Sequence, residues 1–129
     1  MQKGHLPDSS ALLASVFREP GAEKVVSLID DCEIHSVNLA EAVRKMLKVG
    51  ATAEEVETIL GELDLKVNVA LSARDAFEAG KLGFDARMQG LSVRDCICLT
   101  VGGRSGQIVV TADRRWSELA GQAKVIQIR

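Results

Sequence analysis

Apolar residues recur along this chain in two alternating kinds of segment. Some repeat at the three- to four-residue spacing of a helix, and others form brief β-branched runs that are typical of strands. The spacing predicts helices over residues 11–17, 21–31, 39–49, 52–63, 73–88, 93–101 and 114–119, and strands over residues 4–7, 33–36, 66–69, 107–111 and 125–128. No hairpin signal joins two of these strands. The pattern therefore predicts an α/β fold, a mainly parallel sheet with helices on both faces.

Small polar residues precede several predicted helices, where their side chains can accept hydrogen bonds from free backbone N–H groups. Thr52 with Glu55 predicts a capping box. The other expected caps are Ser9 or Ser10, Ser36 or Asn38, Ser72, and Ser92. The glycine pair at residues 102 and 103 is expected to end the helix that begins at Val93.

The composition is that of one globular domain, residues 1–129, in which 47% of residues are hydrophobic. The odd count of three cysteines, without a secretory signal, argues against a disulfide framework and favours the reducing cytosol. Cys96 and Cys98 lack the second pair that a zinc site needs. No apolar run approaches the roughly 20 residues of a membrane span. The chain is expected to be a soluble, cytoplasmic protein.

Charge is distributed unevenly about a net value of −2. Residues 1–80 contain 8 Lys+Arg and 14 Asp+Glu, whereas residues 81–129 contain 8 and 4. The basic C-terminal part could form a surface that faces phosphates, and a mixed solvated surface is an equally available interpretation. The chain has no Tyr, one Trp and three Phe, so stacking platforms for single-stranded bases are not favoured.

Three acids fall at or just past the ends of predicted strands, and a fourth lies in the first turn of a helix. Asp8 follows the first strand, Glu41 comes just past the second, Asp113 follows residues 107–111, and Asp95 lies near Ser92. Sites in parallel sheets lie outside the carboxyl ends of the strands. Four carboxylates in one cleft would repel one another unless they held a hard cation such as Mg²⁺ or Mn²⁺.

Such a cation could activate water, align it with phosphorus and stabilise the leaving oxygen, which amounts to metal-assisted phosphodiester hydrolysis without a protein nucleophile. The alternative is that the four are unrelated acids, each stabilised by the dipole of its own helix. Spacing alone leaves both interpretations open.

Four residue strings favour the first interpretation. They closely resemble the signature segments of PIN-domain proteins, and among these the VapC-type toxins of bacterial toxin–antitoxin pairs; the strings are Asp8–Ala14, Ser36–Glu41, Gly90–Leu99 and Thr111–Leu119. The resemblance covers essentially the whole chain. It implies a compact three-layer α/β/α sandwich, a Mg²⁺- or Mn²⁺-dependent endoribonuclease acting on RNA, a homodimer, and an antitoxin protein that blocks the cleft.

The resemblance also implies roles for individual residues. The catalytic, metal-binding quartet would be Asp8, Glu41, Asp95 and Asp113. Ser10, Asn38 and Thr111 would orient these carboxylates through hydrogen bonds, and Arg114 or Arg115 would lie near the RNA backbone. Two positions depart from the family pattern: Pro7 replaces the apolar residue that normally ends the first strand, and Arg94 stands where relatives often have Gly.

Two other functions compete with the ribonuclease. The acidic net charge and the disturbed first strand motivate the first, a catalytically weak or inactive PIN-fold module that binds proteins. An aspartate-nucleophile phosphatase using Asp8 is disfavoured, because such enzymes usually have a second acid two positions on, where this chain has Ser10.

Overall fold

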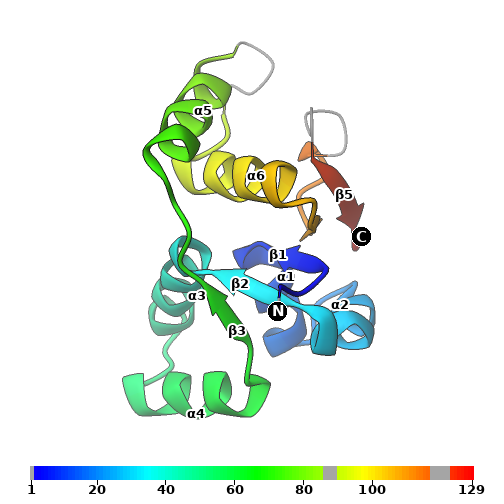
Figure 1. Ribbon diagram of the computed structural model, residues 1–129. Coiled ribbons are helices and arrows are strands. Elements are labelled where there is room, and N and C mark those ends of the chain that lie inside the picture. Colours follow the sequence, from blue (N-terminus) through cyan, green and yellow to red (C-terminus); the bar gives the residue numbers. More distant parts are fainter. Residues whose placement is uncertain (1, 86–89, 117–122) are drawn as a thin grey trace.

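Parallel strands form the middle of the structure, a computed structural model that describes residues 2–85, 90–116 and 123–129 (Figure 1). The strands in these ranges are β1 (His5–Pro7), β2 (Glu33–His35), β3 (Lys66–Asn68), β4 (Ile108–Thr111) and β5 (Lys124–Gln127). β4 lies between β1 and β5, β2 pairs with β3, and every one of these pairs is parallel. A parallel bridge between His5 and Cys32 connects the two sets. The predicted parallel sheet is confirmed.

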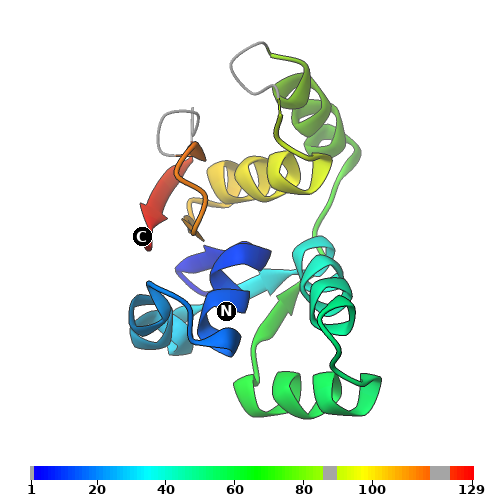
Figure 2. The ribbon, with the colours of Figure 1, turned by 180° about the vertical axis from the view of Figure 1, so that it is seen from behind.

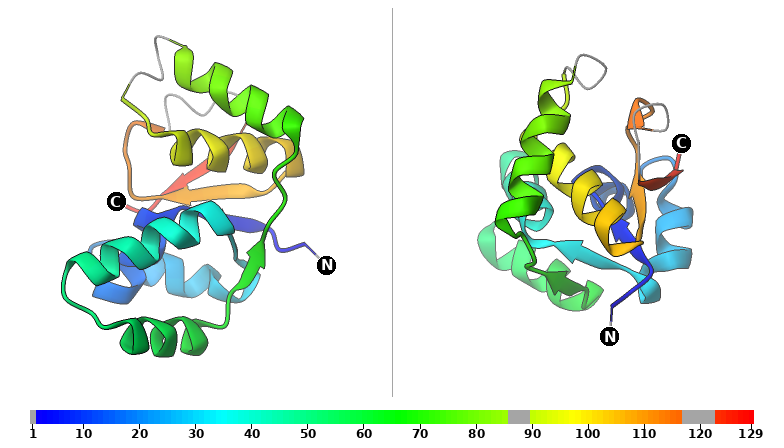
Figure 3. Two further views of the ribbon diagram at one scale, coloured as in Figure 1. Left: turned by 90° about the vertical axis from the view of Figure 1, so that its left-hand side faces the viewer. Right: turned by 45° about the horizontal axis from the view of Figure 1, so that its top comes forward.

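Helices cover both faces of the strands, so the α/β/α sandwich is also confirmed (Figure 3). One layer holds α5 (Ala73–Phe84) and α6 (Val93–Ser105). The other holds α1 (Ser9–Phe17), α2 (Ala22–Leu28) with the following 3-10 turn Ile29–Asp31, α3 (Ser36–Lys48) and α4 (Ala53–Leu63). Within this second layer α1 lies between α2 and α3 (Figure 2). No helix in the described ranges is both long and apolar enough to cross a membrane.

The strands send side chains into hydrophobic clusters on both faces of the sheet, because successive residues of a strand point to opposite faces. Leu6 and Val109 pack with the buried residues of α6. The next residue of β4, Val110, packs instead with Ala11 and Val25 of the opposite layer. α6 is buried along much of its length, with Cys96, Ile97, Cys98, Leu99, Val101 and Gly102 all inaccessible or nearly so.

α6 ends later than the sequence predicts. The helix continues through the glycine pair to Ser105 and stops at Gly106, whose φ of 75° is left-handed. Gly102 lies so close to β4 that a Cβ there would meet Val109 Cγ2 at 2.5 Å. Close packing thus requires a glycine inside the helix and outweighs the low helix propensity of that residue.

Two of the expected caps are wrong. Asp8 itself caps α1, and His35 caps α3 by accepting a hydrogen bond from Val37 N at 3.2 Å. Ser9 and Ser36 are instead the first residues of these helices, since each helix begins as soon as its strand ends and the last extended residue takes the capping position. The capping boxes of α4, α5 and α6, at Thr52, Ser72 and Ser92, are present.

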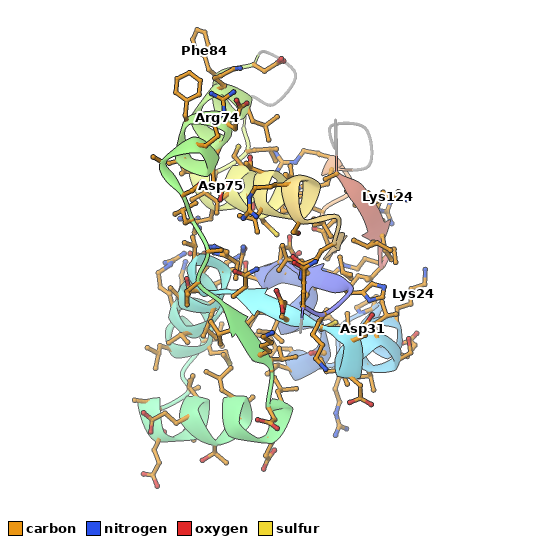
Figure 4. The ribbon with its side chains drawn as sticks, in the orientation of Figure 1. Lys24, Asp31, Arg74, Asp75, Phe84 and Lys124 are labelled. Carbon is orange, nitrogen blue, oxygen red and sulfur yellow. The ribbon has the colours of Figure 1, made fainter. Side chains whose placement is uncertain are left out.

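α5 and α6 are joined by an ion pair in addition to their apolar contact. Arg104 Nε on α6 donates to Asp75 Oδ1 on α5 at 2.6 Å, and Asp75 lies between the two helices (Figure 4). α5 ends at Phe84, and the expected continuation to Met88 falls on residues 86–89, outside the described ranges. The second half of the helix expected over residues 114–119 falls outside them too.

Pro7 does not disturb the first strand. The backbone N–H of the next residue, Asp8, donates to Val110 O at 2.9 Å, so β1 bonds to β4 through Asp8 while the nitrogen of Pro7 faces the other way. A proline is tolerated where a strand needs no donor. Asp8 consequently sits at the carboxyl end of β1, as predicted.

Candidate active site

Asp8 is buried at the junction of β1 and α1, with only 3% of its surface exposed. Its Oδ1 accepts hydrogen bonds from Ser10 Oγ at 2.7 Å and Ala11 N at 2.8 Å, and its Oδ2 accepts one from Thr111 Oγ1 at 2.7 Å. Burial raises the pKa of this carboxyl to about 6, and the charge of Asp95 adds to the rise, while the three donors oppose it. Asp8 therefore carries a negative charge that its surroundings do not fully balance.

The hydroxyls of Ser10 and Thr111 connect the ends of β1 and β4. Besides donating to Asp8, Ser10 Oγ accepts from Ala112 N at 3.0 Å, and Thr111 Oγ1 accepts from Asp113 N at 3.0 Å. Both hydroxyls thus bind the carboxylate of Asp8 and a backbone N–H of the segment that follows β4. This geometry fits the orienting role that the sequence suggested for them.

Asp95 lies in the first turn of α6, half-buried. Its Oδ2 accepts from Ser92 N at 3.0 Å, and its own N–H donates to Ser92 Oγ at 3.2 Å, which completes a capping box. It lies near enough to Asp8 to raise the pKa of that residue. Asp95 is therefore both a structural cap and a neighbour of the buried acid.

Asp113 follows β4 and is held by the residue two positions on. Arg115 Nη2 and Nε donate to Asp113 Oδ2 at 2.7 and 3.2 Å, and Arg115 N donates to Oδ1 at 2.9 Å. This guanidinium lowers the pKa of Asp113, and Arg115 also interacts electrostatically with Asp95. Of the two arginines expected near RNA, Arg115 is thus engaged within the site, and Arg114 Nε donates to Arg129 O at 3.3 Å.

Glu41, on α3, is covered by cationic side chains. Arg44 Nη2 contacts Glu41 Oε1 at 3.0 Å, Lys45 Nζ contacts the same oxygen at 3.6 Å, and Arg94 Nε of α6 contacts Oε2 at 3.0 Å. The hydrogen bonds of Arg44 are the main cause of a lowered pKa at Glu41, and the charge of Arg94 contributes. Arg44 and Lys45 were not among the residues expected at the site, although their spacing of three and four residues from Glu41 is the signal for such pairs.

Among the described residues Asn38 Nδ2 makes no hydrogen bond to a carboxylate, so the orienting role of Asn38 stays a prediction. Asn38 is 1% exposed, and its Nδ2 has no hydrogen-bond partner of ordinary geometry in the described part of the chain. Its amide lies beside the buried thiol of Cys98, whose pKa is raised well above the usual value by burial. A buried N–H donor without a partner can donate a hydrogen bond to an oxygen atom of a ligand.

The four acids occupy one region, but they do not converge. The charge of Asp95 acts on Asp8, and Arg115 interacts with both Asp113 and Asp95. Glu41 contacts Arg94, the residue before Asp95. Within residues 2–85, 90–116 and 123–129, no three His, Cys, Asp or Glu side chains gather closely enough to hold a metal ion. The donor set is nevertheless all carboxylate, as Mg²⁺ and Mn²⁺ prefer, and a cation would balance the charge of Asp8. The four carboxylates are therefore suitable ligands for a divalent cation, although Glu41 and Asp113 are each paired with arginine.

Comparison with known proteins gives the family. The sequence model of the PIN domain matches residues 6–122. A search of curated proteins found no match.

Solved structures share the fold over nearly the whole chain. VapBC2 from Rickettsia felis bound to a promoter DNA fragment has a TM-score of 0.73 at 15% identity, covering 97% of this chain and 98% of that one. DNA-bound VapBC from Salmonella typhimurium has a TM-score of 0.73 at 17% identity and covers 100% of both chains. PAE2754 from Pyrobaculum aerophilum has a TM-score of 0.65 at 22% identity, covering 99% of this chain and 92% of that one. The family match and these shared folds agree, and the chain belongs to the PIN-domain family.

Proposed function

We propose that this protein is a Mg²⁺- or Mn²⁺-dependent endoribonuclease and the toxin of a toxin–antitoxin pair. The observation that carries the proposal is the environment of Asp8. A carboxylate buried at the carboxyl end of a parallel strand, fixed by Ser10 and Thr111 and close to Asp95, is unfavourable by itself. Such a placement is typical of residues that serve a ligand or a reaction.

The chain's own residues would have distinct tasks in this chemistry. Asp8, Glu41, Asp95 and Asp113 would hold the cation, and the hydroxyls of Ser10 and Thr111 would keep Asp8 in one orientation. When bound, the cation supplies Lewis acidity that activates water and stabilises the leaving oxygen of the phosphodiester. Arg114 and Arg115, both exposed, would contact the RNA backbone beside the acids.

An antitoxin partner is part of the proposal. Several similar folds come from complexes: VapBC-1 of nontypeable Haemophilus influenzae has a TM-score of 0.72 at 13% identity, and FitAB bound to DNA has one of 0.66 at 14%. We expect a cognate antitoxin to bind over the acidic site, and the chain to form a homodimer. All three cysteines are buried free thiols, in keeping with the cytoplasm.

The test compares RNA cleavage by purified variants. Wild type, Asp8→Asn and Asp95→Asn are incubated with a mixed RNA substrate in Mn²⁺, in Mg²⁺ and in EDTA. Glu57→Gln is the matched control, because Glu57 is an exposed acid on α4. We expect cleavage by wild type and by the control only with a divalent cation, and a loss of at least about a hundredfold in both aspartate variants. Equal cleavage by all four proteins would contradict the assignment.

One observation favours a second function, a PIN-fold module that binds protein without catalysis. Glu41 and Asp113 are already neutralised by Arg44, Arg94 and Arg115, and no metal cluster forms among the described side chains. Calorimetric titration of the metal-free protein with Mn²⁺ separates the two functions. Binding that disappears in Asp8→Ala supports the nuclease, whereas no binding by wild type supports the module.

A further inference from the structure

The carboxylate of Glu41 has cationic partners on two different helices. Arg44 and Lys45 reach it from the next turn of α3, and Arg94 reaches it from α6. The side chain of Glu41 is 5% exposed, whereas those of Arg44, Lys45 and Arg94 are 60%, 41% and 46% exposed. Glu41 is therefore covered largely by side chains that remain in contact with solvent and can move away from it.

Arg94 differs from the other two partners in what it connects. Arg44 and Lys45 follow Glu41 by three and four residues, a spacing that forms on any helix surface. Arg94 instead lies 53 positions along the chain, directly before Asp95, and its contact joins Glu41 on α3 to the first turn of α6. Arg94 is therefore the partner that links Glu41 to the helix that carries Asp95.

A divalent cation at Glu41 would compete with Arg94 for the same carboxylate. Arg94 Nε is 3.0 Å from Oε2, and Arg44 Nε is 3.3 Å from the same oxygen. Mg²⁺ binds carboxylate oxygens at about 2.0–2.1 Å and keeps several waters around it. A guanidinium on the bound oxygen crowds that shell and repels the cation, so the two positive groups oppose each other at Glu41.

We propose that Arg94 is a positioning residue that acts as an internal counter-ion: its guanidinium occupies the cation position at Glu41 and must leave that carboxylate before Glu41 binds a divalent cation. This inference rests on the proposed function, because it takes Glu41 as a metal-binding residue. It also accounts for the placement of Glu41 against cationic side chains. Release of Arg94 would accompany the approach of Glu41 to the other acids.

The main experiment measures Mn²⁺ affinity of the full-length, metal-free protein by calorimetry. Arg94→Gln should bind Mn²⁺ about twofold to fivefold more tightly than wild type, the range expected when a partly exposed ion pair no longer competes. The Mn²⁺ affinity of Arg94→Lys should lie between those of wild type and Arg94→Gln. Arg74→Gln is the matched control, because Arg74 forms an exposed ion pair with Glu78 on α5, and its affinity should equal that of wild type. Thermal unfolding establishes that each variant is folded.

A double-mutant cycle separates competition at Glu41 from a general change in charge. In a Glu41→Gln background the Arg94→Gln substitution should no longer tighten binding. An effect that persists there would come from the overall electrostatic field and would overturn the proposal. Equal or weaker binding by Arg94→Gln alone would overturn it as well, while leaving the metal-dependent function intact. Failure of every variant to bind Mn²⁺ would overturn both.

A second readout follows the guanidinium directly. The Nε–H resonance of Arg94, assigned by its absence in Arg94→Gln, is recorded by NMR while Mg²⁺ is added. Loss of the Glu41 contact should shift this resonance in step with metal binding, and the Arg74 resonance should stay unchanged. A bound metal with an unshifted Arg94 signal would contradict displacement.

Discussion

Thr111 Oγ1 donates a hydrogen bond to Asp8 Oδ2 at 2.7 Å and joins the end of β4 to the end of β1. The same oxygen accepts from Asp113 N at 3.0 Å. One completely buried hydroxyl thus fixes a buried acid and the start of the segment that carries another.

Thr111→Val should therefore impair function more than stability. The methyl group fills the space of the hydroxyl but leaves Asp8 Oδ2 and Asp113 N each without a partner. We expect RNA cleavage to fall roughly tenfold to a hundredfold and the free energy of unfolding to fall by about 1–2 kcal/mol. Cleavage assays and urea unfolding measure the two effects. Thr111→Ser keeps the hydroxyl and should retain most activity; a fully active valine variant would rule out the orienting role.

Asp8→Asn should stabilise the metal-free protein at neutral pH. The folded-state pKa of Asp8, about 6, lies above its usual value of 3.8. Between these values the folded protein keeps a proton that the unfolded chain has lost, so stability falls as pH rises through this window and stays low above it. This difference in pKa corresponds to a destabilisation of the ionised wild type by roughly 3 kcal/mol. The amide of the variant forms weaker hydrogen bonds, so the net gain in stability of Asp8→Asn should be about 2 kcal/mol.

Thermal unfolding in EDTA between pH 4 and pH 8 tests this linkage. The advantage of Asp8→Asn over wild type should be present at pH 7.5 and should shrink toward zero as the pH falls to about 4. Added Mn²⁺ should stabilise wild type and not the variant. An advantage that does not change with pH would contradict the raised pKa of Asp8.

Two glycine-to-alanine substitutions in helices should have opposite effects. A Cβ at Gly102 would lie 2.5 Å from Val109 Cγ2, whereas a Cβ at Gly80 on α5 meets nothing within 4 Å. Gly102→Ala should lower the free energy of unfolding by about 1–3 kcal/mol through overpacking. Gly80→Ala should raise it by about 0.5–1 kcal/mol through better helix propensity. Urea unfolding of both variants gives the comparison, and similar stabilities would mean that α6 does not approach β4 so closely.

Asp75→Asn should loosen the contact between α5 and α6. Arg104 donates to Asp75 at 2.6 Å and lowers the pKa of this buried carboxyl. The pKa of Asp75 is lower in the folded than in the unfolded protein. The ion pair therefore stabilises the fold fully above the unfolded-state pKa, and this stabilisation is lost as the pH falls through the folded-state pKa. Arg104 is 47% exposed, so we expect a loss of only about 1–2 kcal/mol at pH 7.

The matched control is Glu78→Gln, which removes the exposed pair with Arg74 on the same helix. That variant should change stability by less than about 0.5 kcal/mol. Urea unfolding at pH 7 and at pH 3 measures both. The difference in free energy of unfolding between wild type and Asp75→Asn should be smaller at pH 3 than at pH 7. An equal difference at both pH values would mean that the charge of Asp75 does not stabilise the fold.

Several features of the fold could be predicted because their causes lie within a few residues. The caps at Thr52, Ser72 and Ser92 depend only on neighbouring residues, and the capping box of Thr52 needs only Glu55, three positions on. The caps at Asp8 and His35 were missed, because there the end of a strand, rather than the best capping side chain, decides which residue is last in the extended conformation.

By itself the sequence determined the α/β class, the parallel strands, the position of Asp8, Glu41 and Asp113 near the carboxyl ends of strands, and that of Asp95 in the first turn of a helix. These follow from local spacing and from the rule that parallel strands need crossover connections. The tertiary structure alone decided which partners from distant segments surround Asp8 and Glu41. Asp8 is buried beneath Thr111, and Glu41 is paired with Arg94, and both partners are brought from distant segments by packing of β4 and α6. An acid's charge and partners depend on neighbours in space, which spacing along the chain does not specify.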